Sequence, residues 1–198
     1  SYALYKDIPE NVKIVEEQNP SVLMKSEKND VEAENIRKAH LKDGIAHTRF
    51  MYWLKKNIGK IPMTEISASD KLEEFRAEQE GYLGASFAPI SAFADHGAVI
   101  HYSATKESDV KLEKGKLFLT DTGGHYWEGT TDITRTVALG EVSRKEKEHF
   151  TLTARAMLRL ANTVFLHGCT GANLDCIARE TFWKEKLNCN HGTGHGVG

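Results

Sequence analysis

Two aspartates in a single strand–turn–strand phrase constrain this chain more than any other feature. Asp121 and Asp132 stand eleven positions apart, and a glycine-rich turn separates the strand-like runs that carry them. If the two runs pair as a hairpin, the aspartates lie opposite each other on one face, about 5 Å apart. Carboxylates at that separation can bridge two divalent metal ions about 3.5–4 Å apart, and such ion pairs commonly activate water for hydrolysis. The phrase therefore predicts half of a dinuclear metal site.

Each aspartate also has a simpler interpretation. Asp121 precedes Gly123 and Gly124, and an aspartate before glycines is usually a turn residue. Asp132 stands in a β-branched stretch, where a carboxylate is a poor strand residue unless a metal or Arg135 binds it. Taken together, the two aspartates favour metal binding. Held close without a metal they would repel each other, so one of them should have a raised pKa.

Two histidines are further candidates for the same site. His195 stands between Gly194 and Gly196, where glycines permit the close approach of a substrate and imidazole can bind a metal. His101 ends an apolar strand-like run, and the local pattern alone favours a buried core histidine. The glycine-rich phrase around His195 is not a phosphate-binding loop, because Val197 occupies the position of the third glycine.

Composition narrows the class of protein. The chain has 198 residues, enough for one domain with a substantial core. Its net charge of −2 argues against nonspecific nucleic-acid binding through a broadly basic surface. The sequence has neither the pattern of a secretory signal nor an apolar run of the length that a bilayer requires. Three cysteines without a C-x-x-C pair predict reduced thiols. We therefore expect a cytoplasmic protein with no nucleic-acid or membrane partner.

The N-terminal part of the chain divides into a connector and the start of a domain. Residues 1–25, with prolines and one short apolar stretch, predict an extended connector that follows a preceding domain. Residues 26–198 are expected to form the domain that carries the site. Asn29 with Glu32 three positions later predicts a helix N-terminus, and apolar residues recur at helical spacing as far as Gly59.

The remaining pattern predicts helices on both sides of a sheet in the sequence. A helix is expected from Thr64 to just before Gly81, another from Ser143 to Leu166, and a last one from Asn173 onward. Between them the apolar period changes toward two. The strands expected there are 99–102, 116–120 and 133–137. The order of helices, sheet and helices argues for the α+β class.

The aspartate and glycine phrases resemble the pita-bread metallopeptidases, and most closely the cytosolic Xaa-Pro aminopeptidase branch among them. The resemblance runs through nearly the whole chain, since the sequences of the predicted helices also resemble that branch. The segments that carry it are 35–40, 50–54, 64–68, 71–76, 121–126, 129–136 and 191–198. The resemblance implies an incomplete pita-bread fold, with an antiparallel-rich curved sheet and helices packed on one face. Prolidase, methionine aminopeptidase and creatinase share the metal site but not this helix text.

The resemblance also implies a role for each candidate residue. Asp121 would bind one metal, Asp132 would bridge both, and His195 would complete the site. His101 would contact the substrate or the developing tetrahedral intermediate, and His191 would form a wall of the pocket. The implied reaction is hydrolysis of the bond between an N-terminal residue and a following proline by a metal-bridging hydroxide. Manganese is the expected ion, although these ligand types also accept zinc or cobalt.

One departure from the family pattern limits what this chain can do. The family site needs two further glutamates and another histidine downstream of the glycine-rich phrase, where this sequence stops. We therefore expect the N-terminal part of a catalytic domain, truncated at its C-terminus and inactive alone, from a parent protein that is a homodimer. Two alternatives stay open: a prolidase acting on Xaa-Pro dipeptides, and a pita-bread domain that binds other proteins without catalysis.

Overall fold

The computed structural model describes residues 2–197, so Ser1 and Gly198, the outer ends of the two predicted regions, lie outside it. In chain order, helices come first, short strands follow with one 3-10 helix among them, and helices end the chain. The helices are α1 (Tyr2–Lys6), α2 (Pro20–Ser26), α3 (Asp30–Asn57), α4 (Glu65–Ala77), the 3-10 helix η1 (Ala94–Ala98), α5 (Arg144–Ala161) and α6 (Gly171–Trp183). The strands are β1 (Tyr82–Ala85), β2 (Ile90–Phe93), β3 (Leu117–Thr122), β4 (Gly124–Tyr126), β5 (Gly129–Thr130) and β6 (Ile133–Ala138).

The strands form two small antiparallel sheets. One has the order β1-β4-β5 and the other the order β2-β3-β6, with β3 in its middle. The α+β class and the antiparallel pairing predicted from the sequence are therefore confirmed. The strands expected at 116–120 and 133–137 correspond to β3 and β6.

The strand expected at 99–102 is wrong. These residues follow η1 as turns, in which the Val99 amide donates to His96 and the Tyr102 amide donates to Val99. Side-chain contacts explain the difference, because the Tyr102 hydroxyl donates to the buried Glu65 carboxylate at 2.8 Å and holds the segment folded back. The apolar run is a turn anchored by tertiary contacts, and strands β1, β2, β4 and β5 were not predicted.

Helix α3 begins where the capping pattern predicts, and α4 begins directly after the expected Thr64. The Asn29 side chain accepts from the Glu32 amide at 2.9 Å, and the Glu32 carboxylate accepts from the Asn29 amide at 3.0 Å. Thr64 and Ser67 make the same reciprocal pair at the start of α4. Reciprocal caps satisfy amides that the first helical turn leaves free, so both starts could be predicted locally.

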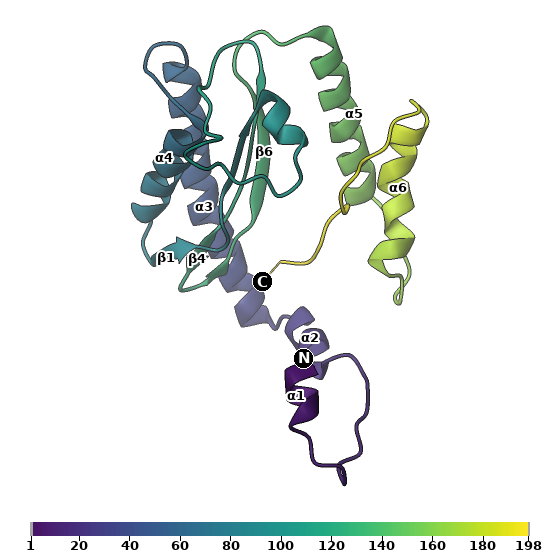
Figure 1. Cartoon of the computed structure of the whole chain (residues 1–198). Coiled ribbons are helices and arrows are strands. Elements are labelled where there is room, and N and C mark those ends of the chain that lie inside the picture. The colour runs from purple at the N-terminus through teal and green to yellow at the C-terminus, as the bar shows by residue number, and fades with distance from the viewer. Residues whose placement is uncertain (1, 198) are drawn as a thin grey trace.

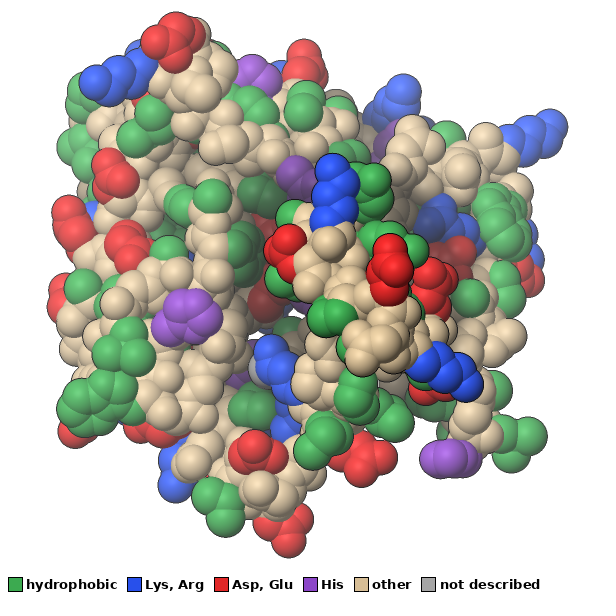
Figure 2. All heavy atoms as spheres, turned by 60° about the horizontal axis from the view of Figure 1, so that its bottom comes forward, with side chains coloured by type: hydrophobic (Ala, Val, Ile, Leu, Met, Phe, Trp, Pro, Cys, Tyr) green, Lys and Arg blue, Asp and Glu red, His purple; other side chains and the backbone are tan. Residues whose placement is uncertain are grey.

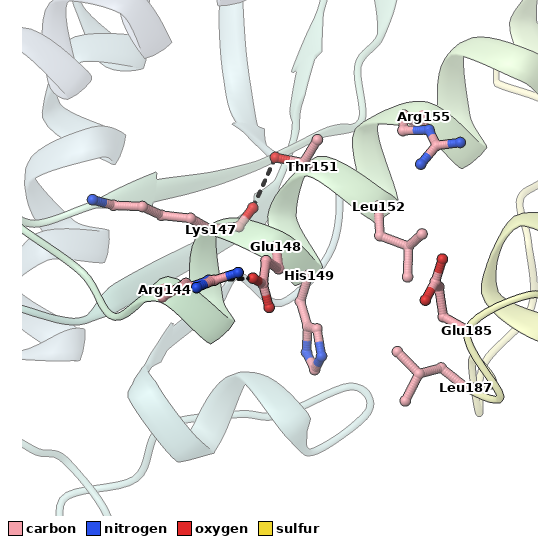
Figure 3. Close-up of a pocket in the computed structure, with 9 residues that line it drawn as sticks. All are labelled: Arg144, Lys147, Glu148, His149, Thr151, Leu152, Arg155, Glu185 and Leu187. Atoms are coloured by element: carbon pink, nitrogen blue, oxygen red, sulfur yellow. Dashed lines mark hydrogen bonds and ion pairs between the residues drawn. The ribbon is translucent and has the colours of Figure 1, made fainter.

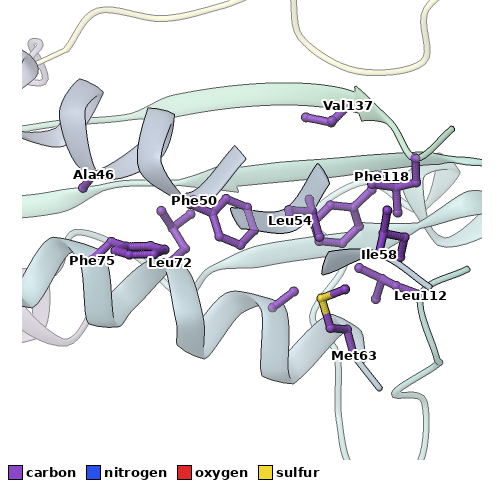
Figure 4. Close-up of a cluster of buried hydrophobic side chains, with 12 residues drawn as sticks. Ala46, Phe50, Leu54, Ile58, Met63, Leu72, Phe75, Leu112, Phe118 and Val137 are labelled. Carbon is purple, nitrogen blue, oxygen red and sulfur yellow. The ribbon is translucent and has the colours of Figure 1, made fainter. Parts of the chain in front are cut away.

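The core lies between these two helices and one face of the β2-β3-β6 sheet (Figure 4). Alternate residues of β3 face it, since Phe118, Thr120 and Thr122 are buried while their neighbours are only partly so. Full burial of a side chain such as Leu54 or Phe118 contributes about 1.5–3 kcal/mol. The prediction that helices pack on one face of the sheet is confirmed for α3 and α4. The opposite face of β3 is left to carry Leu119 and Asp121.

Helices α5 and α6 pack against each other beside this core (Figure 1). The expected extension of α5 to Leu166 is wrong, because the helix ends at Ala161 and the Asn162 side chain donates to the Leu158 carbonyl. Val164 is 97% exposed, so no burial of that apolar run supports another turn. Helix α6 starts at Gly171, two residues before the expected Asn173, which instead lies inside the first turn as a capping partner.

The N-terminal segment has two short helices rather than a fully extended connector. Every residue of α1 and α2 is exposed, and both helices lie apart from the rest of the chain in Figure 1. Asn19 caps α2 by accepting from the Ser21 amide at 3.0 Å, and Pro20 occupies its first turn, a position that proline favours. Local capping therefore folds this stretch where the prolines predicted an extended chain.

The surface carries charges of both signs. Acidic and basic side chains are interspersed over the face seen in Figure 2, in keeping with the nearly balanced total. Among residues 2–197, no helix has both the length and the apolar character needed to cross a bilayer.

Candidate metal centre

The two aspartates lie at one end of the central strand and its neighbour. Asp121 is in β3, where it pairs with Ile90 of β2 and with Thr134 of β6. Asp132 lies one residue before β6, so it is a diagonal neighbour of Asp121 and not directly opposite it, as the simple hairpin predicted. The reason is that β4 and β5 form a separate pair within the connection, in the other sheet. Diagonal neighbours still lie within reach of each other.

The surroundings of Asp132 favour its protonated form. Burial raises the pKa of Asp132 above its ordinary value, the negative charge of Asp121 raises it further, and His195 acts in the opposite direction. Asp121 also has an unusual atom: within residues 2–197 its Oδ1 is buried and accepts no hydrogen bond. A buried acceptor without a partner costs about 1–3 kcal/mol, which a bound cation would offset. The raised pKa expected for one of the two aspartates is thus found at Asp132, with burial as its first cause and the charge of Asp121 as its second.

His195 reaches the same place from the glycine-rich segment. Its Nε2 lies 3.3 Å from Asp132 Oδ2, and its Nδ1 is 2.8 Å from the carbonyl of Gly196. The segment is anchored to α6, because the Arg179 guanidinium donates to the His191 carbonyl at 2.8 Å. The Thr193 hydroxyl donates to a carboxylate on the same helix. Helix α6 therefore brings the last histidines beside the sheet.

A single pocket joins most of the predicted residues. It has a volume of about 440 Å³ and lies between the η1 loop, the exposed face of β3 and the glycine-rich segment. His101, Asp121, His191 and His195 all line it, and Asp132 adjoins it through its contact with His195. The structure thus brings together all five residues that the sequence singled out.

His101 is not the buried core histidine that its local sequence pattern favoured. Its side chain is exposed and its backbone is left-handed, with φ of 55°. A residue with a side chain rarely adopts that conformation, and tertiary contacts must hold it there. The tyrosine that follows it supplies such a contact through the buried Glu65.

The donor set suits a divalent metal but does not complete a site. Two carboxylates and an imidazole are ligands that manganese, zinc and cobalt accept. Within residues 2–197 the Oδ1 of Asp121 has no hydrogen-bond partner, and a bound cation would give it one. Among residues 2–197, however, no three histidine, cysteine, aspartate or glutamate side chains lie close enough together to enclose an ion. The described residues therefore do not by themselves make up a complete metal site.

A larger cavity elsewhere is a weaker candidate. It has a volume of about 610 Å³ and lies beside α5 (Figure 3), where it is lined by charged side chains that include Arg144, Glu148 and Arg155. The Arg144 guanidinium donates to the Glu148 carboxylate at 2.7 Å, so part of this charge is neutralised within the helix. None of the residues singled out from the sequence lines this cavity.

The buried polar residues beneath the site were not predicted from the sequence. Asp43, Glu65 and Arg76 are at most 1% exposed, and their charges point into the core side of the sheet. A signal was present for Asp43, because it shares the helical spacing of the buried Ala39 and Ala46. A charged residue on the apolar side of a helix requires a buried partner.

Relatives of this chain are peptidases. Xaa-Pro aminopeptidase 2 of Sus scrofa is 39% identical over 198 residues, which cover 100% of this chain and 29% of that protein. The probable Xaa-Pro aminopeptidase P of Paracoccidioides brasiliensis (strain Pb03) is 40% identical over 188 residues, which cover 94% of this chain and 30% of the relative. The chain therefore spans about 30% of the length of these relatives.

Solved structures agree with the predicted pita-bread fold. The X-prolyl aminopeptidase of Caenorhabditis elegans, described as a cytosolic enzyme with a di-nuclear active site, superposes with a TM-score of 0.85 at 39% identity. That match covers 88% of this chain and 29% of the other. The Xaa-Pro dipeptidase of Bacillus anthracis gives a TM-score of 0.77 at 28% identity, over 89% of this chain and 47% of the other. The profile of metallopeptidase family M24 matches residues 34–198, most of the chain, and the chain belongs to that family.

Proposed function

We propose that this chain supplies part of the dinuclear metal centre of an Xaa-Pro aminopeptidase, which hydrolyses the bond between an N-terminal residue and a following proline. The observation that carries the proposal is the buried, partnerless Oδ1 of Asp121, which lies in a pocket with three histidines and beside Asp132. The relatives named above support this choice of substrate.

Each residue has a distinct part in this proposal. Asp121 and Asp132 would hold the ions through their carboxylates, and His195 would add an imidazole donor from the glycine-rich segment. His101 and His191 line the pocket, where they contact the peptide and keep it against the metal side. The ions, most simply manganese with zinc or cobalt as alternatives, supply an activated water when bound.

The described donors are too few for two ions, so the chain alone is proposed to bind divalent metal weakly and to leave peptides uncleaved. Residues 26–198 are proposed to be the N-terminal part of a catalytic domain, and residues 1–25 a connector from another domain. The parent protein is proposed to be a cytoplasmic homodimer, as the resemblance implies. A preparation shown by intact mass to contain only the 22.1 kDa chain should not turn over an Xaa-Pro peptide.

Metal binding by the aspartates is the direct test. We expect Mn²⁺, followed by the relaxation of water protons or by electron paramagnetic resonance, to bind the chain and to be lost in Asp121→Asn and Asp132→Asn. Asp70→Asn is the matched control, because it removes the same charge from an exposed position on α4. Unchanged Mn²⁺ affinity in both site variants would show that these aspartates are not ligands.

Prolidase activity is the second candidate, favoured by the similarity to the Bacillus anthracis Xaa-Pro dipeptidase. A dipeptidase must recognise the free carboxylate of its dipeptide, whereas an aminopeptidase accepts longer peptides. Comparing an Xaa-Pro dipeptide with an Xaa-Pro tripeptide, on a protein that contains this chain together with the remaining ligands, separates the two. Cleavage of the dipeptide alone would favour prolidase, and metal binding without any cleavage would favour the non-catalytic domain.

A further inference from the structure

A buried ion pair lies directly beneath the two aspartates, on the core side of the sheet. Asp43 of α3 and Arg76 of α4 are 0% and 1% exposed. The Arg76 Nε donates to Asp43 Oδ1 at 2.7 Å, and its Nη2 donates to Oδ2 at 3.3 Å. A buried, bidentate ion pair thus joins α3 and α4, the two helices that cover the sheet.

The arginine of this pair extends to the strand that carries Asp121. Its Nη2 donates to the hydroxyl of Thr122 at 2.9 Å. Thr122 follows Asp121 in β3, and successive side chains in a strand point to opposite faces. Thr122 is therefore bonded to Arg76 on the core side of the sheet, while Asp121 faces the pocket on the other side. The position of Arg76 thus fixes the position of the strand backbone that carries Asp121.

The aspartate of the pair extends to the loop that carries Asp132. The hydroxyl of Thr131, the residue before Asp132, donates to Asp43 Oδ2 and accepts from the Gly124 amide at 2.9 Å. Thr131 is 0% exposed, and its amide donates to the Gly124 carbonyl at 2.9 Å. The loop before β6 is therefore held by the same ion pair as the end of β3.

The two bound segments also touch each other directly. A Cβ added at Gly123 would lie 1.9 Å from the Thr131 carbonyl oxygen, so the backbones are closer than any side chain permits. The Ser86 hydroxyl donates to that same carbonyl at 2.9 Å. The end of β3 and the loop before β6 are therefore in direct backbone contact and are also joined through one ion pair. Their relative position has little freedom.

A buried ion pair is a poor source of stability, because removing both charges from water cancels much of their attraction. A buried ion pair can instead fix one arrangement of the groups that bond to it. Here those groups are the threonines next to Asp121 and Asp132.

We propose that the Asp43–Arg76 pair is a positioning device that sets the separation of Asp121 and Asp132 through Thr122 and Thr131, and with it the affinity for divalent metal. The pair itself does not touch the metal or the substrate. This inference rests on the metal site proposed above.

Removing single hydroxyl groups tests the device without breaking the ion pair. Thr131→Val and Thr122→Val keep the side-chain shape but lose the bonds to Asp43 and Arg76. We expect each to weaken Mn²⁺ binding to the chain about tenfold, which corresponds to loss of one hydrogen bond to a charged group. Thr131→Ser retains the hydroxyl and should bind Mn²⁺ as the wild type does.

Thr120→Val is the matched control. Thr120 is also buried in β3 and also adjoins Asp121, but its hydroxyl bonds His47 at 3.2 Å instead of the ion pair. We expect this variant to unfold at a lower urea concentration, much as the other valine variants do, while its Mn²⁺ affinity stays within about twofold of wild type.

The outcomes separate the inference from the proposed function. Wild-type affinity in both Thr122→Val and Thr131→Val overturns the positioning role, as does an equal loss in Thr120→Val. Failure of the wild type to bind Mn²⁺, or unchanged binding in Asp121→Asn, overturns the metal site and the inference together. Loss in the two linked variants with recovery in Thr131→Ser supports the positioning role.

Discussion

Protonation of His47 should control the acid stability of this fold. His47 lies on α3, is 2% exposed, and contacts the Thr120 hydroxyl at 3.2 Å. Burial, reinforced by the positive charge of Arg76 and opposed by the negative charge of Asp43, lowers the pKa of His47 from 6.5 to about 4. The histidine is therefore neutral in the folded protein at pH values where the unfolded chain has already taken up the proton.

The size of the effect follows from proton linkage. The unfolded chain binds the extra proton below about pH 6.5, and the folded protein binds it only near pH 4. The free energy of unfolding thus falls as the pH falls through this window, by about 2 kcal/mol between pH 8 and pH 5 and by about 3 kcal/mol between pH 8 and pH 4. For a domain with about 5–15 kcal/mol of stability this is a large loss.

Urea unfolding at pH 8 and pH 5 measures this contribution as a difference between variants. His47→Gln keeps a hydrogen-bonding side chain without the titration, so its loss of stability on acidification should be smaller than that of the wild type by about 2 kcal/mol. His149→Gln, on an exposed position of α5, should lose as much as the wild type. An equal acid loss in the wild type and His47→Gln would refute the reasoning, because it would assign the acid sensitivity to other groups.

Two further substitutions probe the loops that shape the site. Gly123→Ala should destabilise the protein by about 3 kcal/mol in urea unfolding, since its Cβ would lie 1.9 Å from the Thr131 carbonyl oxygen. Gly44→Ala, with nothing within 4 Å in the middle of α3, should instead stabilise by up to about 1 kcal/mol. A mild effect at Gly123 would mean that the two segments can separate. Glu65→Gln should speed amide hydrogen exchange across residues 94–102, because the Glu65 carboxylate accepts from the Phe93 amide at 2.6 Å and lies 2.9 Å from the His96 ring. Unchanged exchange in this segment would show that Glu65 does not anchor it.

The parts of the fold that the sequence predicted well are those set by neighbours along the chain. The starts of α3 and α5 follow from reciprocal caps within four residues, and β3 and β6 from short alternating runs. These signals depend on local hydrogen bonds and side-chain periodicity, which are legible without any knowledge of tertiary structure.

The parts that were missed depend on contacts between distant segments. The turn at 99–102 has strand-like residues, yet the buried Glu65 far away in sequence bends it by accepting from the Tyr102 hydroxyl. The register of the aspartates shifted because β4 and β5 joined another sheet. The end of α5 came early because Val164 found nothing to bury it. In each case tertiary contacts, or their lack, overrode the local preference.

The candidate site itself combines both kinds of information. The aspartates could be recognised from the sequence because a carboxylate in a β-branched run needs a reason to be there. The sequence did not reveal that each aspartate adjoins a threonine facing the other way, Thr122 after Asp121 and Thr131 before Asp132. Because successive side chains in a strand point to opposite faces, each aspartate faces the pocket and the threonine beside it bonds to the buried ion pair. Within residues 2–197 the Oδ1 of Asp121 has no hydrogen-bond partner, whereas the hydroxyl of Thr122 beside it accepts from Arg76 of the buried ion pair.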